Sequence, residues 1–147
     1  MQSWITPYVV WCMTRNGGKA LSLDTRIPTP VGDKVMGDIQ VGDLVFDDEG
    51  NPCKVTYTSP VYIGHDCFAV SFEDGERIIA DAEHNWFVRI DGHRDKVCTT
   101  AEMYGDYVNR SAYGNTYKYS VQVCGFRSDR KYVTEIKRVD SVPVKCI

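Results

Sequence analysis

The stretch CFAVSFEDGERIIA, residues 67–80, decides the fold class. Two apolar runs of strand length, 67–72 and 77–80, flank the polar turn EDGE, and this arrangement is typical of a β-hairpin. Outward from it, DLVFD and CKVTYT flank the turn DEGN in the same way, and NWFVRI ends at a third turn signal, DGH. Strands are therefore predicted over 8–13, 43–47, 53–58, 67–72, 77–80, 85–90, 118–123, 131–139 and 142–147.

One helix interrupts this series of strands. Thr99 and Glu102 have the spacing of an N-terminal capping box, which predicts a short helix from about 99 to 109. Turn signals recur at regular intervals through the rest of the chain, as they do in antiparallel β folds. The fold class predicted is all-β with one short helix.

Composition limits the function classes. The 147 residues are 43% hydrophobic and 25% charged, with a net charge of −3, so a nucleic-acid-binding surface is not expected. No apolar run is long enough to span a bilayer, and Met1–Trp11 lacks the features of a secretory signal. We therefore expect a cytoplasmic protein with no membrane partner.

The six cysteines are interpreted from the same expectation of a cytoplasmic protein. In a reducing compartment their thiols are expected to be free. Their spacing is irregular and contains no Cys-x-x-Cys pair, so no zinc site, no other metal site and no cofactor is expected.

The composition changes once, between Lys19 and Ala20. MTRNGGK, residues 13–19, follows a predicted strand and ends in Gly-Lys, as a phosphate-binding loop does. However, Met13 stands where that loop has its first glycine, and Ala20 stands where it has Ser or Thr. The segment is a weak ATP site, a glycine-rich linker, or one half of a phosphate loop whose other half lies elsewhere.

The chain from Ala20 onward resembles a known family. ALSLDTRIPTPVGDKVMGDIQVGDLVF (20–46) resembles the opening motif of inteins and other Hint-family autoprocessing domains. RIIADAEHNWFV (77–88) resembles the histidine motif of that family, and YVTEIKRVDSVPVKCI (132–147) resembles its late hairpin motif. The motifs occur in the family's order and leave no room for a homing-endonuclease insert. The resemblance implies a Hint-type horseshoe of antiparallel strands over 20–147, preceded by an N-extein over 1–19.

The first residue of this segment departs from most inteins. They begin with Cys or Ser, whereas Ala20 carries no nucleophile. Either Ala20 is an engineered replacement, or the chain resembles class three inteins, in which a cysteine of the late motif attacks instead. Cys146 in that motif, and Trp86 just after His84, favour the class three interpretation.

The resemblance implies the roles of the site residues. Cys146 would attack the Lys19 carbonyl and form a thioester, while His84 protonates the leaving Ala20 amine. Trp86 would pack over the junction and hold the bond near the nucleophile. The activity would be single-turnover autocatalytic cleavage and splicing, not that of a turnover enzyme.

Supporting residues are assigned in the same way. The pair Asp24 and Thr25, or backbone N–H groups, would stabilise the oxyanion. Asp81, where many inteins have Thr, would orient His84 and raise its pKa, or would only cap the local turn. His65 and His93 match no motif and are left as structural residues.

The sequence leaves several alternatives open. The family's terminal Asn and last strand are missing, so we expect the N-terminal part of a split intein or a truncated chain, with an open sheet edge at 142–147. Its partners would be the flanking exteins in cis and a short C-terminal intein fragment in trans. The host would be an ATPase such as a helicase or a viral DNA-packaging ATPase. The other function classes are a cleavage-only Hint domain and a non-catalytic β binding module in which Cys146, His84 and Trp86 are core residues.

Overall fold

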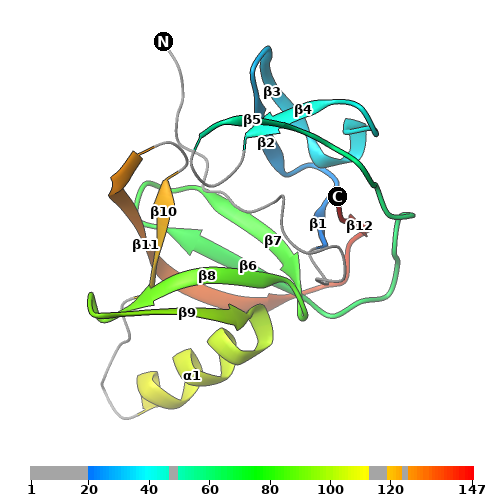
Figure 1. Cartoon of the computed structure of the whole chain (residues 1–147). Coiled ribbons are helices and arrows are strands. Elements are labelled where there is room, and N and C mark those ends of the chain that lie inside the picture. Colours follow the sequence, from blue (N-terminus) through cyan, green and yellow to red (C-terminus); the bar gives the residue numbers. More distant parts are fainter. Residues whose placement is uncertain (1–19, 47–49, 113–118, 124–125) are drawn as a thin grey trace.

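The computed structural model describes residues 20–46, 50–112, 119–123 and 126–147. These residues form antiparallel strands and one α-helix, so the predicted all-β fold is confirmed (Figure 1). The predictions for 8–13, for 13–19 and for part of the 48–51 turn lie outside the described residues.

Eight strands form the main sheet, and each neighbouring pair in it is antiparallel. Across the sheet the order is β12-β1-β7-β6-β11-β10-β8-β9, so the first and last described strands are neighbours at one edge. The strands are β1 (Leu21–Ser22), β6 (Cys67–Phe72), β7 (Arg77–Asp81), β8 (Asn85–Ile90), β9 (Arg94–Thr99), β10 (Tyr119–Val123), β11 (Phe126–Val139) and β12 (Val144–Lys145).

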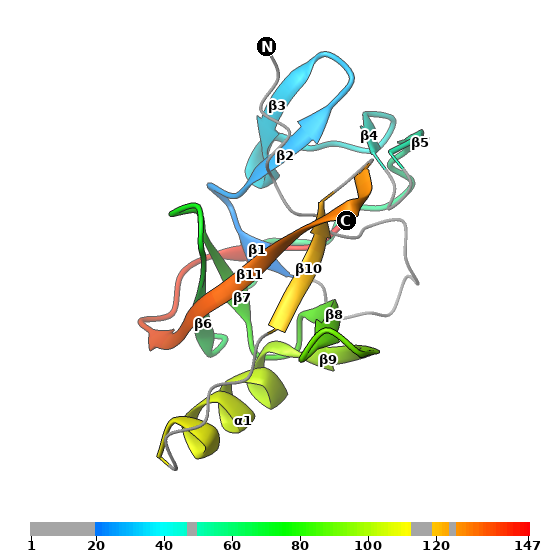
Figure 2. The same ribbon diagram turned by 90° about the vertical axis from the view of Figure 1, so that its left-hand side faces the viewer.

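Two small hairpins and a 3-10 turn lie beyond one side of this sheet. They are β2 (Arg26–Thr29) with β3 (Gly32–Val35), β4 (Leu44–Phe46) with β5 (Pro52–Lys54), and η1 (Met36–Asp38). The helix α1 (Thr100–Ala112) lies on the opposite side, beneath β8 and β9 (Figures 1 and 2). The main sheet therefore separates the small hairpins from the helix.

The hydrophobic core lies around the central strands. Every residue of β6 except Ser71 is buried, which explains the continuous apolar run in its sequence. Most residues of the main core cluster come from β6, β7, β8, β10, β11 and α1, and β1, η1 and β9 contribute one each. Among them are Phe68, Val70, Phe72, Ile78, Trp86, Val88, Met103, Tyr119 and Ile136.

Strand β9 was not predicted, because four of its six residues are exposed and carry no apolar alternation. It pairs with β8 through a tight turn at Asp91 and Gly92, whose φ angles of 50° and 78° are both positive. Two positive φ angles are the mark of a type I′ hairpin turn, which glycine adopts without strain. An exposed ion pair of 2.7 Å between Arg89 and Asp95 also spans the two strands.

The predicted helix is confirmed together with its cap. The Glu102 N–H donates to the Thr99 hydroxyl at 3.2 Å, and the Thr99 N–H donates to the Glu102 carboxylate at 3.1 Å. These reciprocal bonds satisfy two of the N–H groups that a helix start leaves unpaired. The helix ends at Ala112, three residues beyond the predicted end.

The last strand is shorter than predicted. Only Val144 and Lys145 of the 142–147 run are in β12, because the Cys146 N–H donates to the Ser59 hydroxyl at 2.9 Å instead of to a strand. The expectation that the sheet edge at 142–147 is open is also wrong for β12. On the side away from β1, Val144 exchanges two backbone hydrogen bonds with Tyr62, of 2.8 and 3.0 Å, and the Cys146 carbonyl accepts from the Ser59 N–H at 2.8 Å.

The cysteines correct one expectation. Cys67, Cys98 and Cys146 are free thiols, but Cys53 is disulfide-bonded. The lack of a secretory signal says nothing about which sulfur atoms the fold brings into bonding distance.

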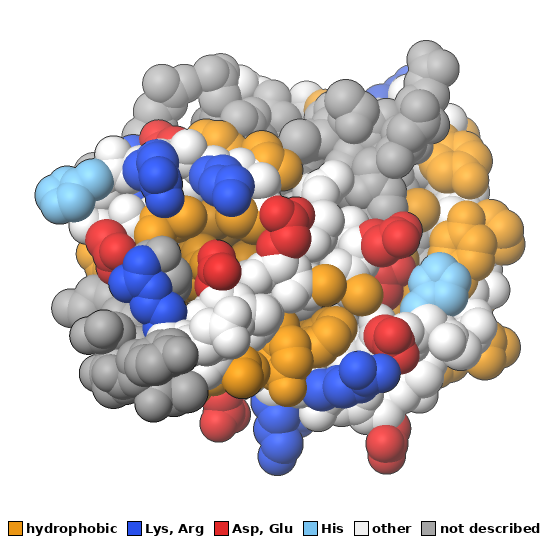
Figure 3. Space-filling view, turned by 90° about the horizontal axis from the view of Figure 1, so that it is seen from below, with side chains coloured by type: hydrophobic (Ala, Val, Ile, Leu, Met, Phe, Trp, Pro, Cys, Tyr) orange, Lys and Arg blue, Asp and Glu red, His pale blue; other side chains and the backbone are white. Residues whose placement is uncertain are grey.

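The surface is of mixed charge on the face seen in Figure 3. Acidic and basic side chains alternate there around hydrophobic areas, and neither sign forms a continuous patch among the described side chains. Within the part of the chain that the structure describes, no helix is both long and apolar enough to cross a membrane.

Candidate active site

Ala20 and Cys146 lie at the same end of the β1–β12 pair. In this pair Leu21 faces Lys145 and Ser22 faces Val144, so Ala20 and Cys146 are the next residues beyond its last pairing. On the side away from β1, the backbone of Cys146 bonds to Ser59. Both residues belong to one small hydrophobic cluster with Cys67 and Val144.

Asp81 contacts Ala20 from the other neighbouring strand. The Asp81 N–H donates to the Ala20 carbonyl at 3.2 Å, in line with the pairing of Leu21 with Ala80. Ala20 is only 2% exposed. The residue after the predicted junction is thus enclosed between the strand of the candidate nucleophile and the end of β7. Lys19 itself lies outside the described residues.

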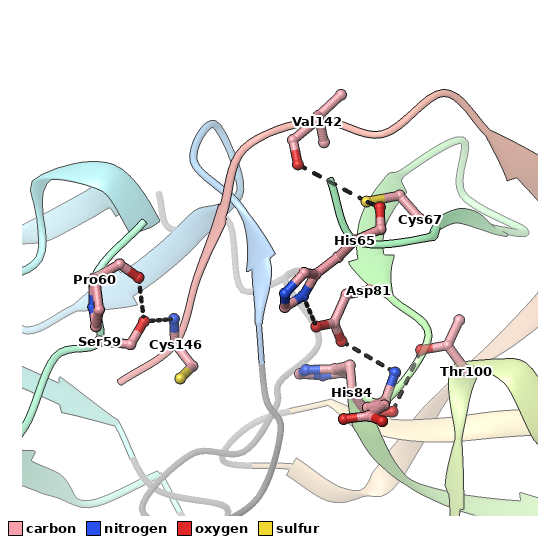
Figure 4. Close-up of polar contacts among 10 residues, drawn as sticks. Ser59, Pro60, His65, Cys67, Asp81, His84, Thr100, Val142 and Cys146 are labelled. Carbon is pink, nitrogen blue, oxygen red and sulfur yellow. Dashed lines mark hydrogen bonds and ion pairs between the residues drawn. The ribbon is translucent and has the colours of Figure 1, made fainter. Parts of the chain in front are cut away.

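His84 is held by the turn that joins β7 to β8. Its N–H donates to the Asp81 carbonyl at 3.2 Å, which closes the turn. The first N–H groups of α1 then donate to the same turn, Thr100 to the His84 carbonyl and Ala101 to the Ala82 carbonyl, each at 3.0 Å. The imidazole is buried, and it points toward β1, on whose other side Cys146 lies (Figure 4).

Trp86 lies directly beside His84. The two rings meet nearly at right angles, at 77°, with 5.0 Å between their centroids. The indole N–H donates to the Thr100 hydroxyl at 2.8 Å, and that hydroxyl is 3.3 Å from the His84 carbonyl, to which it donates. Trp86 is also part of the main core cluster, so it packs the core and contacts the imidazole at once.

The carboxylate of Asp81 has two partners. One oxygen accepts from the Glu83 N–H at 3.2 Å, which caps the turn, and the other lies 3.0 Å from Nδ1 of His65. Burial raises the pKa of this carboxyl above its ordinary value, while the hydrogen bond and charge of His65 act in the opposite direction. The His84 N–H bonds to the Asp81 carbonyl and also lowers the pKa of the carboxyl, as the Glu83 N–H does.

Two site residues were missed by the sequence reasoning. His65 reaches Asp81 because the β6–β7 hairpin pairs Cys67 with Asp81. Ser59 bonds to Cys146, which lies 87 residues further along the chain. Neither residue belongs to a local motif, so no sequence signal pointed to them.

Cys146 is partly exposed, in contrast to the other two free thiols. A phenol lies near it: the pKa of Tyr57 is raised, first by partial desolvation and then by the charges of Tyr62 and Cys146.

Asp24 and Thr25 lie at the far end of β1 from Ala20. The Ser22 hydroxyl donates to the Asp24 carboxylate at 2.6 Å and lies 3.0 Å from the Thr25 hydroxyl, so these side chains bond within their own turn. They line a groove of about 510 Å³ between the β2–β3 hairpin and the β6–β7 turn. The described residues contain no group of three or more His, Cys, Asp or Glu side chains arranged to hold a metal ion.

Solved structures with the same arrangement of strands identify the family. The Msm DnaB1 intein splicing domain bound with zinc is 34% identical, with a TM-score of 0.65 over 86% of this chain and 82% of that one. The chain belongs to the intein family. The MchDnaB-1 intein gives the same TM-score of 0.65 at 32% identity, and no family model matches. The Hint fold expected from the three motifs is therefore confirmed.

Curated relatives extend the comparison. The intein is 33% identical over 132 residues to the replicative DNA helicase DnaB of Mycobacterium leprae (strain TN), and 38% identical over 96 residues to that of Mycobacterium intracellulare. These matches take in 88% and 65% of the intein but span only 21% and 17% of the helicases.

Proposed function

We propose that this intein breaks the Lys19–Ala20 peptide bond through a thioester on Cys146. The thiolate attacks the Lys19 carbonyl, a bond forms between that carbon and Sγ, and the bond to the Ala20 nitrogen breaks. A proton then goes to the Ala20 amine, and His84 supplies it. The supporting observation is that the β1–β12 pair brings Ala20 and Cys146 into one hydrophobic cluster, because attack requires the thiol and the junction to lie close together.

A related intein supports this division of roles. The gp41-1 intein, 25% identical with a TM-score of 0.63, has been solved with three substitutions: its first cysteine to alanine, a phenylalanine to tryptophan, and an aspartate to cysteine. The present chain carries the same three residue types at Ala20, Trp86 and Cys146. An engineered alanine alone would not bring the tryptophan and the cysteine with it, so their presence favours a class three mechanism. The matches to DnaB favour a helicase as the host and its flanking segments as the exteins.

Intact mass measurement of the full chain tests the proposal. Cleavage releases residues 1–19, and an added thiol should accelerate release by capturing the thioester. Cys146→Ala should abolish cleavage, whereas Cys98→Ala, a free thiol buried in the main core, should retain it. Cleavage by the Cys146→Ala protein would contradict the proposal, and cleavage that appears only after Ala20→Cys would support the engineered alternative.

Two further arms separate the remaining functions. A peptide carrying a C-terminal intein segment and an extein should yield a ligated product if the chain splices, and only released residues 1–19 if it is a cleavage-only domain. Alkylation of Cys146 by iodoacetamide at a rate typical of a reactive thiol argues against an inert binding module.

A further inference from the structure

We propose that His65 is a positioning residue for the cleavage reaction, because it fastens the segment that holds Cys146 to the turn that holds His84. The inference rests on the proposed function. The segment is residues 55–66, here named the linking segment, which join β5 to β6 without forming a strand of the main sheet.

The first half of the linking segment holds Cys146. The Ser59 N–H donates to the Cys146 carbonyl and the Ser59 hydroxyl accepts from the Cys146 N–H, at 2.8 and 2.9 Å. Three residues on, Tyr62 exchanges two backbone hydrogen bonds with Val144. Both backbone polar groups of Cys146 are thus satisfied by this segment, so its position fixes the position of the thiol.

The second half holds the other side of the site. The ring of His65 stacks on that of Tyr62, with 5.1 Å between centroids and 13° between planes. Nδ1 of His65 is 3.0 Å from the Asp81 carboxylate (Figure 4), and the Asp66 carbonyl accepts from the Ala82 N–H at 2.9 Å.

These contacts close a ring around the junction. Ser59 binds Cys146, His65 binds Asp81, and the Asp81 N–H binds the Ala20 carbonyl. Ala20 and Cys146 in turn belong to the same hydrophobic cluster, at the end of the β1–β12 pair. The pair of His65 and Asp81 is the contact in this ring that joins two ionisable side chains.

The two side chains of this pair are buried to different extents, so the loss of the more exposed one leaves the buried one without its partner. The Asp81 side chain is 6% exposed and that of His65 is 43% exposed. A carboxylate at this depth is costly without a partner, so losing the imidazole favours rearrangement of the turn that also carries His84. The neighbouring acid, Asp66, directs its carboxylate to Arg138 at 2.8 Å and so does not replace Asp81 as the partner of the imidazole.

A substitution series in the full chain tests the inference. His65→Ala should slow Lys19–Ala20 cleavage roughly 10- to 100-fold, the effect expected when reacting groups move by about an ångström. His65→Asn places an amide N–H near the position of Nδ1 and should recover most of the rate. His93→Ala changes a histidine in the β8–β9 turn, far from the junction, and should cleave as the parent protein does.

Alkylation of Cys146 supplies a second readout that does not depend on cleavage. With the linking segment released, the thiol should react with iodoacetamide several-fold faster in His65→Ala than in the parent, and at the parent rate in His65→Asn. Unchanged cleavage and alkylation in His65→Ala would overturn the inference. Equally slow cleavage in the His65→Ala and His65→Asn variants would also overturn the inference, because it would show that the N–H group facing Asp81 has no effect on the rate. The proposed function fails separately, if Cys146→Ala still cleaves.

Discussion

The indole N–H of Trp86 donates a buried hydrogen bond of 2.8 Å to the Thr100 hydroxyl at the first residue of α1. The same hydroxyl donates to the His84 carbonyl, so the helix start, the indole and the imidazole form one connected unit. The helix therefore contributes to the orientation of His84 although it lies outside the sheet.

Trp86→Phe tests the role of this unit in cleavage. Phenylalanine keeps an aromatic ring in the core but loses the indole N–H. The ring beside His84 is then no longer held in place by its hydrogen bond to the Thr100 hydroxyl. We expect a stability loss of about 1–2 kcal/mol and a cleavage rate at least about tenfold lower. Thermal unfolding and intact mass measure the two effects separately. Phe87→Leu, a change at an exposed residue of the same strand, is the control and should alter neither. A normal cleavage rate in Trp86→Phe would exclude an indole-specific role.

Removal of the helix cap should lower stability. Thr99→Ala deletes the acceptor for the Glu102 N–H and should cost about 1 kcal/mol in the free energy of unfolding. Urea denaturation measures the cost, with Thr56→Ala at an exposed position as the control, expected within about 0.5 kcal/mol of the parent. A double variant with Glu102→Ala, which removes the acceptor for the Thr99 N–H, should show non-additive costs, since the two side chains form one box. Strictly additive losses would mean that the reciprocal bonds are independent.

Ser59→Ala should loosen Cys146 without touching the thiol. The variant leaves the Cys146 N–H without its acceptor, at a cost of about 1–3 kcal/mol. We expect faster alkylation of Cys146 and slower cleavage. Ser141→Ala alters an exposed serine on the approach to β12 and should change neither rate. If Ser59→Ala left both rates at the parent value, the hydroxyl would have no part in placing the thiol.

Asp81 should make stability depend on pH in an unusual direction. Its pKa is raised in the fold by burial, so between the ordinary aspartate value of about 4 and the raised value the native protein holds a proton that the unfolded chain has released. Stability therefore falls as pH rises through this window. Asp81→Asn removes that titration, so the stability of the variant relative to the parent should increase with pH over the same window.

Asp95 provides a control of opposite sign. The hydrogen bond from Arg89 holds the pKa of Asp95 below its ordinary value, so Asp95→Asn should lose stability relative to the parent as pH rises. Urea denaturation at several pH values between about 3 and 7 measures both variants. Parallel pH profiles for Asp81→Asn and the parent would contradict the burial argument.

The sequence predicted those parts of the molecule that depend on local patterns. The hairpin at 67–80, the cap at Thr99 and the strand that carries Trp86 were found because each has its signal within a few residues. Strand β9 was missed because its exposed side chains carry no apolar pattern.

Long-range contacts explain the remaining differences. The pairing of His65 with Asp81 and of Ser59 with Cys146 depends on how distant segments meet, and single residues without a motif give no sign of it. The same cause accounts for the shortened β12, whose outer side was expected to be open and is covered by the linking segment.

The neighbouring positions of β1 and β12 set a time order for the reaction during synthesis. Leu21 is among the first described residues to leave the ribosome and Lys145 among the last, yet the two face each other in the folded sheet. Contacts between such distant positions are slow to form because a long loop must close first. Under the proposed mechanism, the thiol of Cys146 would reach the Lys19–Ala20 bond only after almost all of residues 20–146 had been translated. That order would protect the nascent polypeptide from being cut during synthesis.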